Sequence, residues 1–349
     1  MRAALLLFLS LFSLLANAVQ VTQLYRGDVT VEARDNRARS AGVKAALAQV
    51  LVRITGDDSI ASQPQGKALL RQADSFMLTY SFQSGEPLRL QARFDATKLQ
   101  QQMRQLGLPI WGAQRPTTLH WAAIEQTDGQ LRLLSDADEL GEKVAAHAEQ
   151  RGLPQLLPLL DLEDSMKADV NDVRGNFPKL VLEASQRYGS DFVLLSSIEP
   201  IAEQWQYHLH LYSGAVASDP FAVARTLLQG SGEAATEAEA LDQVIAKVAL
   251  YFSLRYGAIA SEQSGQTQLH FTLTGGIAAL VELERYLTSL APVKATKVVA
   301  VTGQEIQIEL DLIGGLAEVE QLMTLEQRLT KLEVVDQLDE RTHYLWQQP

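Results

Sequence analysis

The chain has 349 residues and no cysteine. A chain without cysteine cannot form disulfide bonds, so each of its domains must be held together by an apolar core. The hydrophobic share of 46% and the charged share of 21% are those of a globular protein. At roughly 150 residues per domain, the length predicts two or three domains. The lack of cysteine also excludes thiol nucleophiles and thiolate metal sites.

The N-terminus has the pattern of a secretory signal peptide. Arg2 supplies a positive charge, residues 3–15 are almost wholly apolar, and Ala16-Asn17-Ala18 is a small-x-small cleavage pattern. We therefore expect cleavage after Ala18, so that residues 1–18 are removed and the protein is periplasmic. A membrane anchor is the alternative, but a span needs about 20 apolar residues. No later segment approaches that length, and we expect no integral membrane segment in the mature chain.

The charge balance narrows the classes of partner. The chain has 30 Lys and Arg against 42 Asp and Glu, a net charge of −12. Loss of Arg2 with the leader leaves 29 against 42, or −13. Nucleic acids and anionic lipids are bound by positively charged surfaces, so an acidic chain is a poor candidate for either. We expect no nucleic-acid partner.

The first of three segments spans residues 19–113 and predicts an α+β domain. A strand, a long helix with apolar residues at helical spacing, a short helix, a hairpin and a last helix follow one another. Gly56 and Gly107 end the two longer helices, and Asp95 is placed to cap the last one. Gly107–Pro116 has the composition of a linker. The expected ranges are 25–33, 34–54, 65–73, 76–82, 88–94 and 96–106.

The second segment, residues 117–257, alternates strands and helices and predicts a central α/β domain. Its short strands are almost wholly apolar, as expected for a sheet that is covered on both faces. Trp205, Tyr207, Leu209 and Leu211 share one face of a longer strand. The expected strands are 118–124, 155–160, 192–198, 203–212 and 221–229, and the expected helices are 136–150, 177–188 and 233–256.

The third segment, residues 266–346, has the order strand, helix, strand, strand, helix and a final strand. In the stretch 305–312, apolar and polar residues alternate, which marks a sheet with one face in water. This βαββαβ order predicts a ferredoxin-like domain. The fold class is thus α+β with a central α/β domain, in three small mixed domains in series.

The search for catalytic motifs finds neither a G-x-S-x-G, nor an H-E-x-x-H, nor a Walker phosphate loop. Gly230-Ser231-Gly232 is a degenerate dinucleotide fingerprint, and Ser231 as a helix cap is the simpler interpretation. Asp136-x-Asp138 is a fragment of a calcium loop that lacks further ligands, so a helix start is favoured. We expect no cofactor.

Two histidines and five acids are the remaining candidates. His208 and His210 share a strand face opposite to the apolar one, where a metal site and a solvated face are the alternatives. The acidic loop at 161–172 directly follows a predicted buried strand, at the edge of a sheet where ligands bind. Its carboxylates could cap helices, dock a basic partner, or serve a metal or catalysis. The partner-binding candidates are Asp161, Glu163, Asp164, Asp169 and Asp172.

Several phrases resemble the uncharacterised bacterial family called domain of unknown function 2066. They are Leu156-Leu-Pro-Leu-Leu-Asp-Leu-Glu-Asp164, Ala184-Ser-Gln-Arg-Tyr-Gly189, Asp191–Ser196, Leu51-Val-Arg-Ile-Thr-Gly56 and the stretch Leu280–Val301. The resemblance covers essentially the whole mature chain and implies an exported protein of Gram-negative bacteria. It carries no established activity or site residues. The second segment is also similar in element order to small α/β domains of envelope accessory proteins.

These observations favour a non-catalytic binding or scaffold protein that serves cell-envelope assembly or maintenance. One alternative is an envelope hydrolase or metal-dependent enzyme that uses the acidic loop 161–172. Another is a small-ligand carrier with a cleft between the second and third domains. Trp111 and Trp121, near the first linker, are further surfaces to test, with core or hinge packing as the alternative. The sequence identifies neither the partner nor the oligomeric state.

Overall fold

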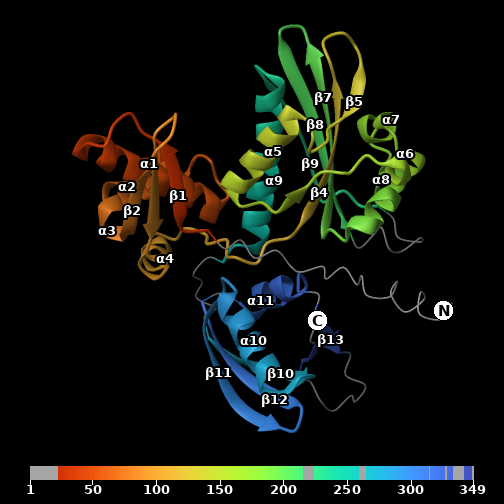
Figure 1. Cartoon of the computed structure of the whole chain (residues 1–349). Coiled ribbons are helices and arrows are strands. Elements are labelled where there is room, and N and C mark those ends of the chain that lie inside the picture. The colour runs from red at the N-terminus through yellow and green to blue at the C-terminus, as the bar shows by residue number, and fades with distance from the viewer. Residues whose placement is uncertain are drawn as a thin grey trace, which may run out of the picture.

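The computed structural model describes residues 23–214, 224–258, 265–313, 315–326, 328–332 and 342–347 (Figure 1). The predicted leader 1–18 lies outside these residues, as do residues 221–223 of the predicted strand 221–229. In the described part of that range the strand begins only at Leu228, so this prediction was wrong for residues 224–227. Within the described ranges the fold is mixed α/β with three sheets. We call the parts of the chain that carry them the N-terminal region (23–113), the central region (114–258) and the C-terminal region (265–347). None of the helices in these ranges is both long and apolar enough to span a membrane.

The N-terminal region forms an antiparallel sheet in the order β1-β3-β2, against which the long helix α1 packs. The predicted elements are confirmed, with small shifts at their ends. Asp35 accepts from the backbone N of Ala38 and Asp95 from that of Lys98, so both helices have side-chain caps. The bounds are β1 Arg26–Thr30, α1 Asn36–Thr55, a 3₁₀ turn Ile60–Ser62, α2 Pro64–Arg71, α3 Ala73–Phe76, β2 Met77–Gln83, β3 Arg89–Phe94 and α4 Ala96–Gln105.

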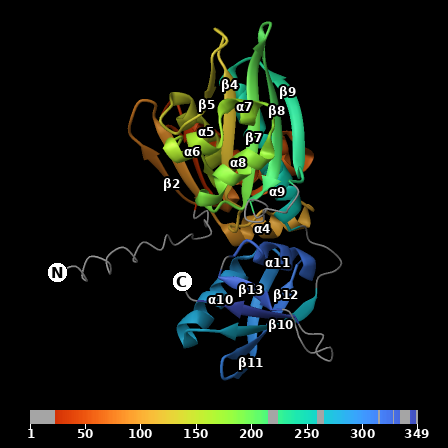
Figure 2. The ribbon, with the colours of Figure 1, turned by 90° about the vertical axis from the view of Figure 1, so that its right-hand side faces the viewer.

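The central region forms a sheet in the order β5-β4-β7-β8-β9, with β6 beside β4. Helices α5 and α9 cover one face, and α6, α7 and α8 cover the other (Figures 1 and 2). This double cover explains the apolar strands. The bounds are β4 Thr118–Glu125, β5 Leu131–Leu133, α5 Glu139–Arg151, β6 Gln155–Leu156, α6 Leu162–Lys167, α7 Val170–Arg174, α8 Pro178–Ser185, a 3₁₀ turn Gln186–Tyr188, β7 Phe192–Ile201, β8 Gln204–Ser213, β9 Leu228–Ala234 and α9 Glu237–Tyr256.

Two predictions for the central region were wrong. The expected strand 155–160 ends at Leu156, because Pro158 has no N–H for a ladder and Leu160 takes a left-handed backbone, with φ 53°. The expected helix 233–256 begins only at Glu237, and Thr236 caps it. Ser231 therefore lies within β9 and caps no helix.

The C-terminal region follows the expected order as far as its second helix and then departs from it. Two strands come after α11, and the sheet order is β11-β12-β10-β14-β13. β14 pairs with β10 in parallel, so the ferredoxin-like prediction is not confirmed. The predicted alternation in 305–312 is confirmed in β12. The bounds are β10 Gln266–Leu273, α10 Gly276–Ser289, β11 Val293–Thr302, β12 Glu305–Leu312, α11 Leu316–Met323, β13 Leu329–Leu332 and β14 His343–Trp346.

The predicted linker 107–116 is a buried connection between regions. Trp111 and Arg115 are both buried, and the backbone of Ile110 pairs with Ala258 just after α9. Trp121 is buried as well, so core packing is the correct interpretation for both tryptophans. The C-terminal region lies below the other two in Figures 1 and 2, and one apolar cluster runs from the central region into it.

Candidate functional site

The acidic segment 161–172 begins two short helices on the outer face of the central sheet. Asp161 is the N-cap of α6 and accepts from the backbone N of Asp164 at 3.1 Å. Asp169 is the N-cap of α7, where it forms a capping box with Asp172. A capping carboxylate satisfies backbone N–H groups that the first helical turn leaves without partners. The acids of this segment thus fall into two groups, one at each helix start.

Arg187 joins the first group from the 3₁₀ turn that follows α8. Its guanidinium makes a bidentate pair with Asp161, with nitrogen–oxygen distances of 3.0 and 2.7 Å, and lies 3.1 Å from Glu163. This pair lowers the pKa of Asp161. Lys167, one turn along α6, donates to Glu163 at 3.1 Å and lowers the pKa of that carboxyl. Asp161 and Glu163 are both exposed. Because their pKa values are lowered, both are negatively charged at neutral pH.

Asp164 has a different environment, because it is buried. One carboxylate oxygen accepts from the backbone N of Leu160 at 2.9 Å and from the Tyr188 hydroxyl at 2.6 Å. Burial, together with the hydrogen bond to Asp164, raises the pKa of Tyr188 to about 12. The other oxygen of Asp164 lies 3.6 Å from Nε of Arg187. These contacts hold the bend between β6 and α6.

The chemistry that these acids can perform is limited by their separation. In the described part of the chain, no three His, Cys, Asp or Glu side chains form a group able to hold a metal ion. Each acid of the segment contacts a helix start, a cation or a tyrosine in the same region. The capping alternative is therefore confirmed for Asp161, Asp169 and Asp172. Partner docking by the exposed acids stays a prediction.

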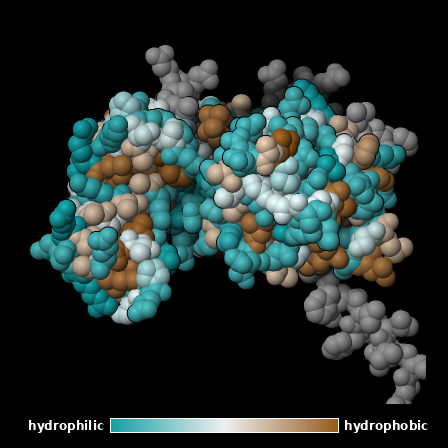
Figure 3. Space-filling model, turned by 90° about the horizontal axis from the view of Figure 1, so that it is seen from above, coloured by the Kyte–Doolittle hydropathy of each residue, from teal (hydrophilic) through white to brown (hydrophobic). Residues whose placement is uncertain are grey.

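Large apolar side chains are exposed around the same helices. Leu162 and Met166 lie one turn apart on α6 and are 76% and 78% exposed. The helix α8, which packs on α6, exposes two more apolar side chains near its start. In Figure 3, hydrophobic atoms gather at the lower right of the view, the side on which α6–α8 lie. We call this surface the α6–α8 face; its residues are Leu159, Leu162, Met166, Phe177 and Leu180.

Sequence reasoning missed this surface. Leu162 and Met166 have the four-residue spacing of one helix face, but the acidic residues around them predict a loop. Arg187, which draws two of the acids together, lies 26 residues after Asp161. No local pattern connects the two residues.

The structure also places the other candidate residues, which are the two histidines, Asp138 and the stretch Gly230-Ser231-Gly232. His208 and His210 are half-buried and line a hollow of about 280 Å³ with Arg174 and Glu199, rather than an open solvated face. Burial and the neighbouring His208 lower the pKa of His210. Asp138 is the N-cap residue of α5, which confirms the helix start. Gly230-Ser231-Gly232 lies inside β9 and not at a helix start, so the structure does not support a dinucleotide site there.

The expected place for a ligand cleft holds a hollow of about 540 Å³. It is lined by residues around the start of β7 and the end of α9, together with Thr324 and Leu325 after α11. Asp191 at its rim accepts from the backbone N and the hydroxyl of Thr117, and burial raises its pKa. The small-ligand carrier stays a prediction.

Two family models match parts of the chain. DUF2066 matches residues 267–337, which confirms the expected resemblance for that range. Domain of unknown function (DUF8605) matches residues 18–112, so the opening strand and helix are similar to a different family from the one expected. The phrases at 156–164 and 184–196 lie outside both matches. No curated protein matches the chain.

Two solved structures show weak likeness to it. The C-terminal domain of LpoB from Salmonella enterica is 14% identical, with 35% of this chain and 83% of that chain covered at a TM-score of 0.25. Lipoprotein GNA1162 from Neisseria meningitidis is 16% identical, with 35% and 81% covered at a TM-score of 0.24. At these scores the likeness bears on neither the fold nor the function of this chain.

Proposed function

We propose that the protein is a non-catalytic, periplasmic component of the cell envelope that binds a partner protein through the α6–α8 face. The observation that carries this proposal is the cluster of exposed apolar side chains on α6 and α8. Exposed apolar patches that are rimmed by polar residues mark interaction surfaces. The signal-peptide pattern of residues 1–18 supports export.

The chemistry of the face defines the partner that it fits. Residues 161–172 contain five carboxylates and one cation, Lys167, beside the apolar side chains. A complementary surface presents an apolar segment flanked by Lys or Arg. Burial of a large apolar side chain contributes roughly 1.5–3 kcal/mol, so two or three such anchors would supply a large share of the binding free energy. The partner is therefore expected to be a protein with an amphipathic, basic segment.

The acids beside the α6–α8 face are not equally suited to charge-reversal experiments, because some of them also stabilise the fold. Charge reversal at Asp161 or Asp164 would remove a helix cap or a buried acceptor, so it would change folding as well as binding. Glu163 is exposed and caps no helix. Glu163→Lys is therefore the variant that changes the charge of the face and leaves both helix starts intact.

Site-specific photo-crosslinking in the living cell tests the proposal. A photo-reactive residue in place of Met166 is expected to capture one protein, whereas the same residue in place of Ile277, which is 82% exposed on α10, should not capture it. Leu162→Ser and Glu163→Lys should each reduce the capture, with unchanged circular dichroism. Equal capture from both positions, or capture that neither substitution changes, would overturn the proposal.

A further inference from the structure

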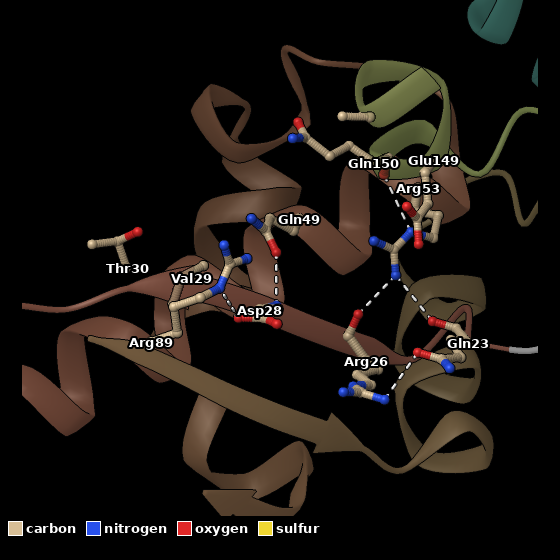
Figure 4. Close-up of a pocket in the computed structure, with 11 residues that line it drawn as sticks. Gln23, Arg26, Asp28, Val29, Thr30, Gln49, Arg53, Arg89, Glu149 and Gln150 are labelled. Carbon is tan, nitrogen blue, oxygen red and sulfur yellow. Dashed lines mark hydrogen bonds and ion pairs between the residues drawn. The ribbon is translucent and has the colours of Figure 1, made fainter. Parts of the chain in front are cut away.

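A groove on the side of the molecule opposite to the α6–α8 face is lined by arginine side chains. It lies between the N-terminal region and α5, has a volume of about 680 Å³, and is lined by residues of β1, α1, β3 and α5 (Figure 4). That volume is within the range of small-molecule sites, which is about 300–1,000 Å³. We call it the arginine groove, because Arg26, Arg53 and Arg89 line it.

The charges in the arginine groove are only partly compensated. Arg89 pairs with Asp28 at 2.8 Å. Neither Arg26 nor Arg53 has a carboxylate within 4.0 Å in the described residues. Glu149 acts on Arg53 only at a longer range. The groove therefore has three guanidinium groups against the carboxylates of Asp28 and Glu149.

The guanidinium of Arg53 is held in place by backbone carbonyls. Its Nη1 donates to the carbonyls of Gln23 at 3.0 Å and Arg26 at 2.7 Å, and its Nε donates to that of Gln150 at 3.2 Å. These bonds fix the group without neutralising it, and burial lowers its pKa. Figure 4 shows Arg53 and Arg89 on opposite sides of Asp28 and Gln49.

A second observation also indicates a local excess of positive charge. Residues 23–113 contain twelve Lys and Arg against eight Asp and Glu, a net charge of +4 in a chain of −12. Arg26 of β1 lies directly opposite Arg93 of β3, and such like-charged cross-strand pairs are destabilising. An anion beside Arg26 would relieve this repulsion.

We propose that the arginine groove binds a small polar ligand whose phosphate or carboxylate groups contact Arg26, Arg53 and Arg89. Guanidinium groups pair with either anion through two parallel hydrogen bonds. Gln49 and Gln150 line the same hollow and supply amide groups for the uncharged part of the ligand. The site is separate from the α6–α8 face and does not depend on the proposed function.

Calorimetric titration of the mature chain with pyrophosphate and with citrate tests this inference. Within the described residues, the one hydrogen bond that the Arg26 side chain donates goes to Gln23, at 3.0 Å, so Arg26→Gln should fold normally. We expect this variant to bind at least about tenfold more weakly. Arg93→Gln removes the same charge next to the groove but outside its lining, and should change the affinity by less than about twofold. Glu149→Gln removes a negative charge and should tighten binding.

The source of the anion is distinguished by a second measurement. Sedimentation with vesicles of phosphatidylglycerol, compared with phosphatidylcholine, tests a lipid headgroup; binding lost in Arg26→Gln and kept in Arg93→Gln supports that source. The inference is overturned if neither soluble anion nor anionic vesicle binds. It is also overturned if Arg93→Gln weakens binding as much as Arg26→Gln, because the effect would then be one of general charge. Crosslinking from position 166 should be the same in all three variants.

Discussion

The guanidinium of Arg115 donates to the backbone carbonyl of Arg53 at 2.8 Å, across 62 residues of sequence. The same side chain donates to the carbonyls of Arg151 and Gly152 at the end of α5, and to those of Trp111 and Gly112. The carbonyls at the C-terminal ends of α1 and α5 carry the negative ends of the helix dipoles. Arg115, which has no carboxylate partner among the described residues, is thus a buried cation stabilised by two helix ends, and it joins the N-terminal and central regions.

Replacement of Arg115 should strongly destabilise the protein. Arg115→Met leaves five buried or half-buried carbonyls without their donor, and we expect the free energy of unfolding to fall by about 3–5 kcal/mol. Lysine has three donors on a flexible stem, so the free energy of unfolding of Arg115→Lys should lie between those of Arg115→Met and the wild type. Urea denaturation followed by tryptophan fluorescence measures both changes. The control is Arg93→Met on the surface; equal stability of Arg115→Met and this control would contradict the assigned role.

Acid should destabilise the protein through His120. This side chain is buried, where Nε2 is 2.8 Å from the Ser196 hydroxyl, and burial lowers its pKa from 6.5 to about 3. Below pH 6.5 the unfolded chain takes up a proton that the folded chain does not bind until about pH 3. The free energy of unfolding should therefore fall by up to about 1.4 kcal/mol per pH unit over that interval.

The contribution of His120 is isolated by comparison with His120→Gln. Above pH 6.5 the histidine is neutral in both states, so the difference in stability between the two proteins should be constant. Between pH 6 and pH 4 the wild type should lose stability faster than the variant. Parallel curves over this range would show that His120 is protonated in the folded protein.

Asp164 and Glu163 are adjacent acids with different roles. Asp164→Ala leaves the backbone N–H of Leu160 and the hydroxyl of Tyr188 without their acceptor, and should lower the free energy of unfolding by about 2–3 kcal/mol. Glu163→Ala removes an exposed acid and should leave the thermal midpoint unchanged. Differential scanning calorimetry compares the two. A stable Asp164→Ala protein would remove the argument that this acid holds the bend before α6.

Gly56 and Gly107 have the same left-handed backbone but different surroundings, so substitutions at the two positions distinguish backbone strain from steric clash. Gly56 ends α1 with φ 64°, and a Cβ there would lie 2.6 Å from the side chain of Ser253 on α9. Gly107 has φ 66° and open space around it. Gly107→Ala should cost about 1–2 kcal/mol for the left-handed backbone alone. Gly56→Ala should cost clearly more in the same denaturation experiment; equal costs would mean that α9 can move aside.

Local elements could be predicted where the signal is contained in a few consecutive residues. The apolar spacing of Val43, Leu47, Val50, Leu51 and Ile54 predicted α1, and all five side chains are fully buried. The short loop between β2 and β3 predicted their hairpin, and Asp95 caps the helix that follows it. The prediction of a strand at 155–160 was wrong, because Leu159 lies on an exposed face and Leu160 lies in a bend with a left-handed backbone.

The net charge of the chain and the composition of a segment did not predict the two candidate surfaces. The net charge of −12 disfavours nucleic acids and anionic lipids as partners, yet residues 23–113 are basic. The acidic residues at 161–172 predict a polar surface, yet Leu162 and Met166 beside them are among the most exposed apolar side chains of the described residues. Both surfaces depend on which side chains remain outside the core, and composition does not record that.

The sequence by itself determined the elements of the N-terminal region and the cap at Asp95, because helix and hairpin signals act between residues close in the chain. It also determined the absence of disulfides and the resemblance of residues 267–337 to DUF2066, which the family model matches. Only the tertiary structure decided that Gly107–Pro116 is a buried connection and that β14 pairs in parallel with β10. Those features depend on contacts between distant residues, such as Arg115 with the ends of α1 and α5, which no local pattern encodes.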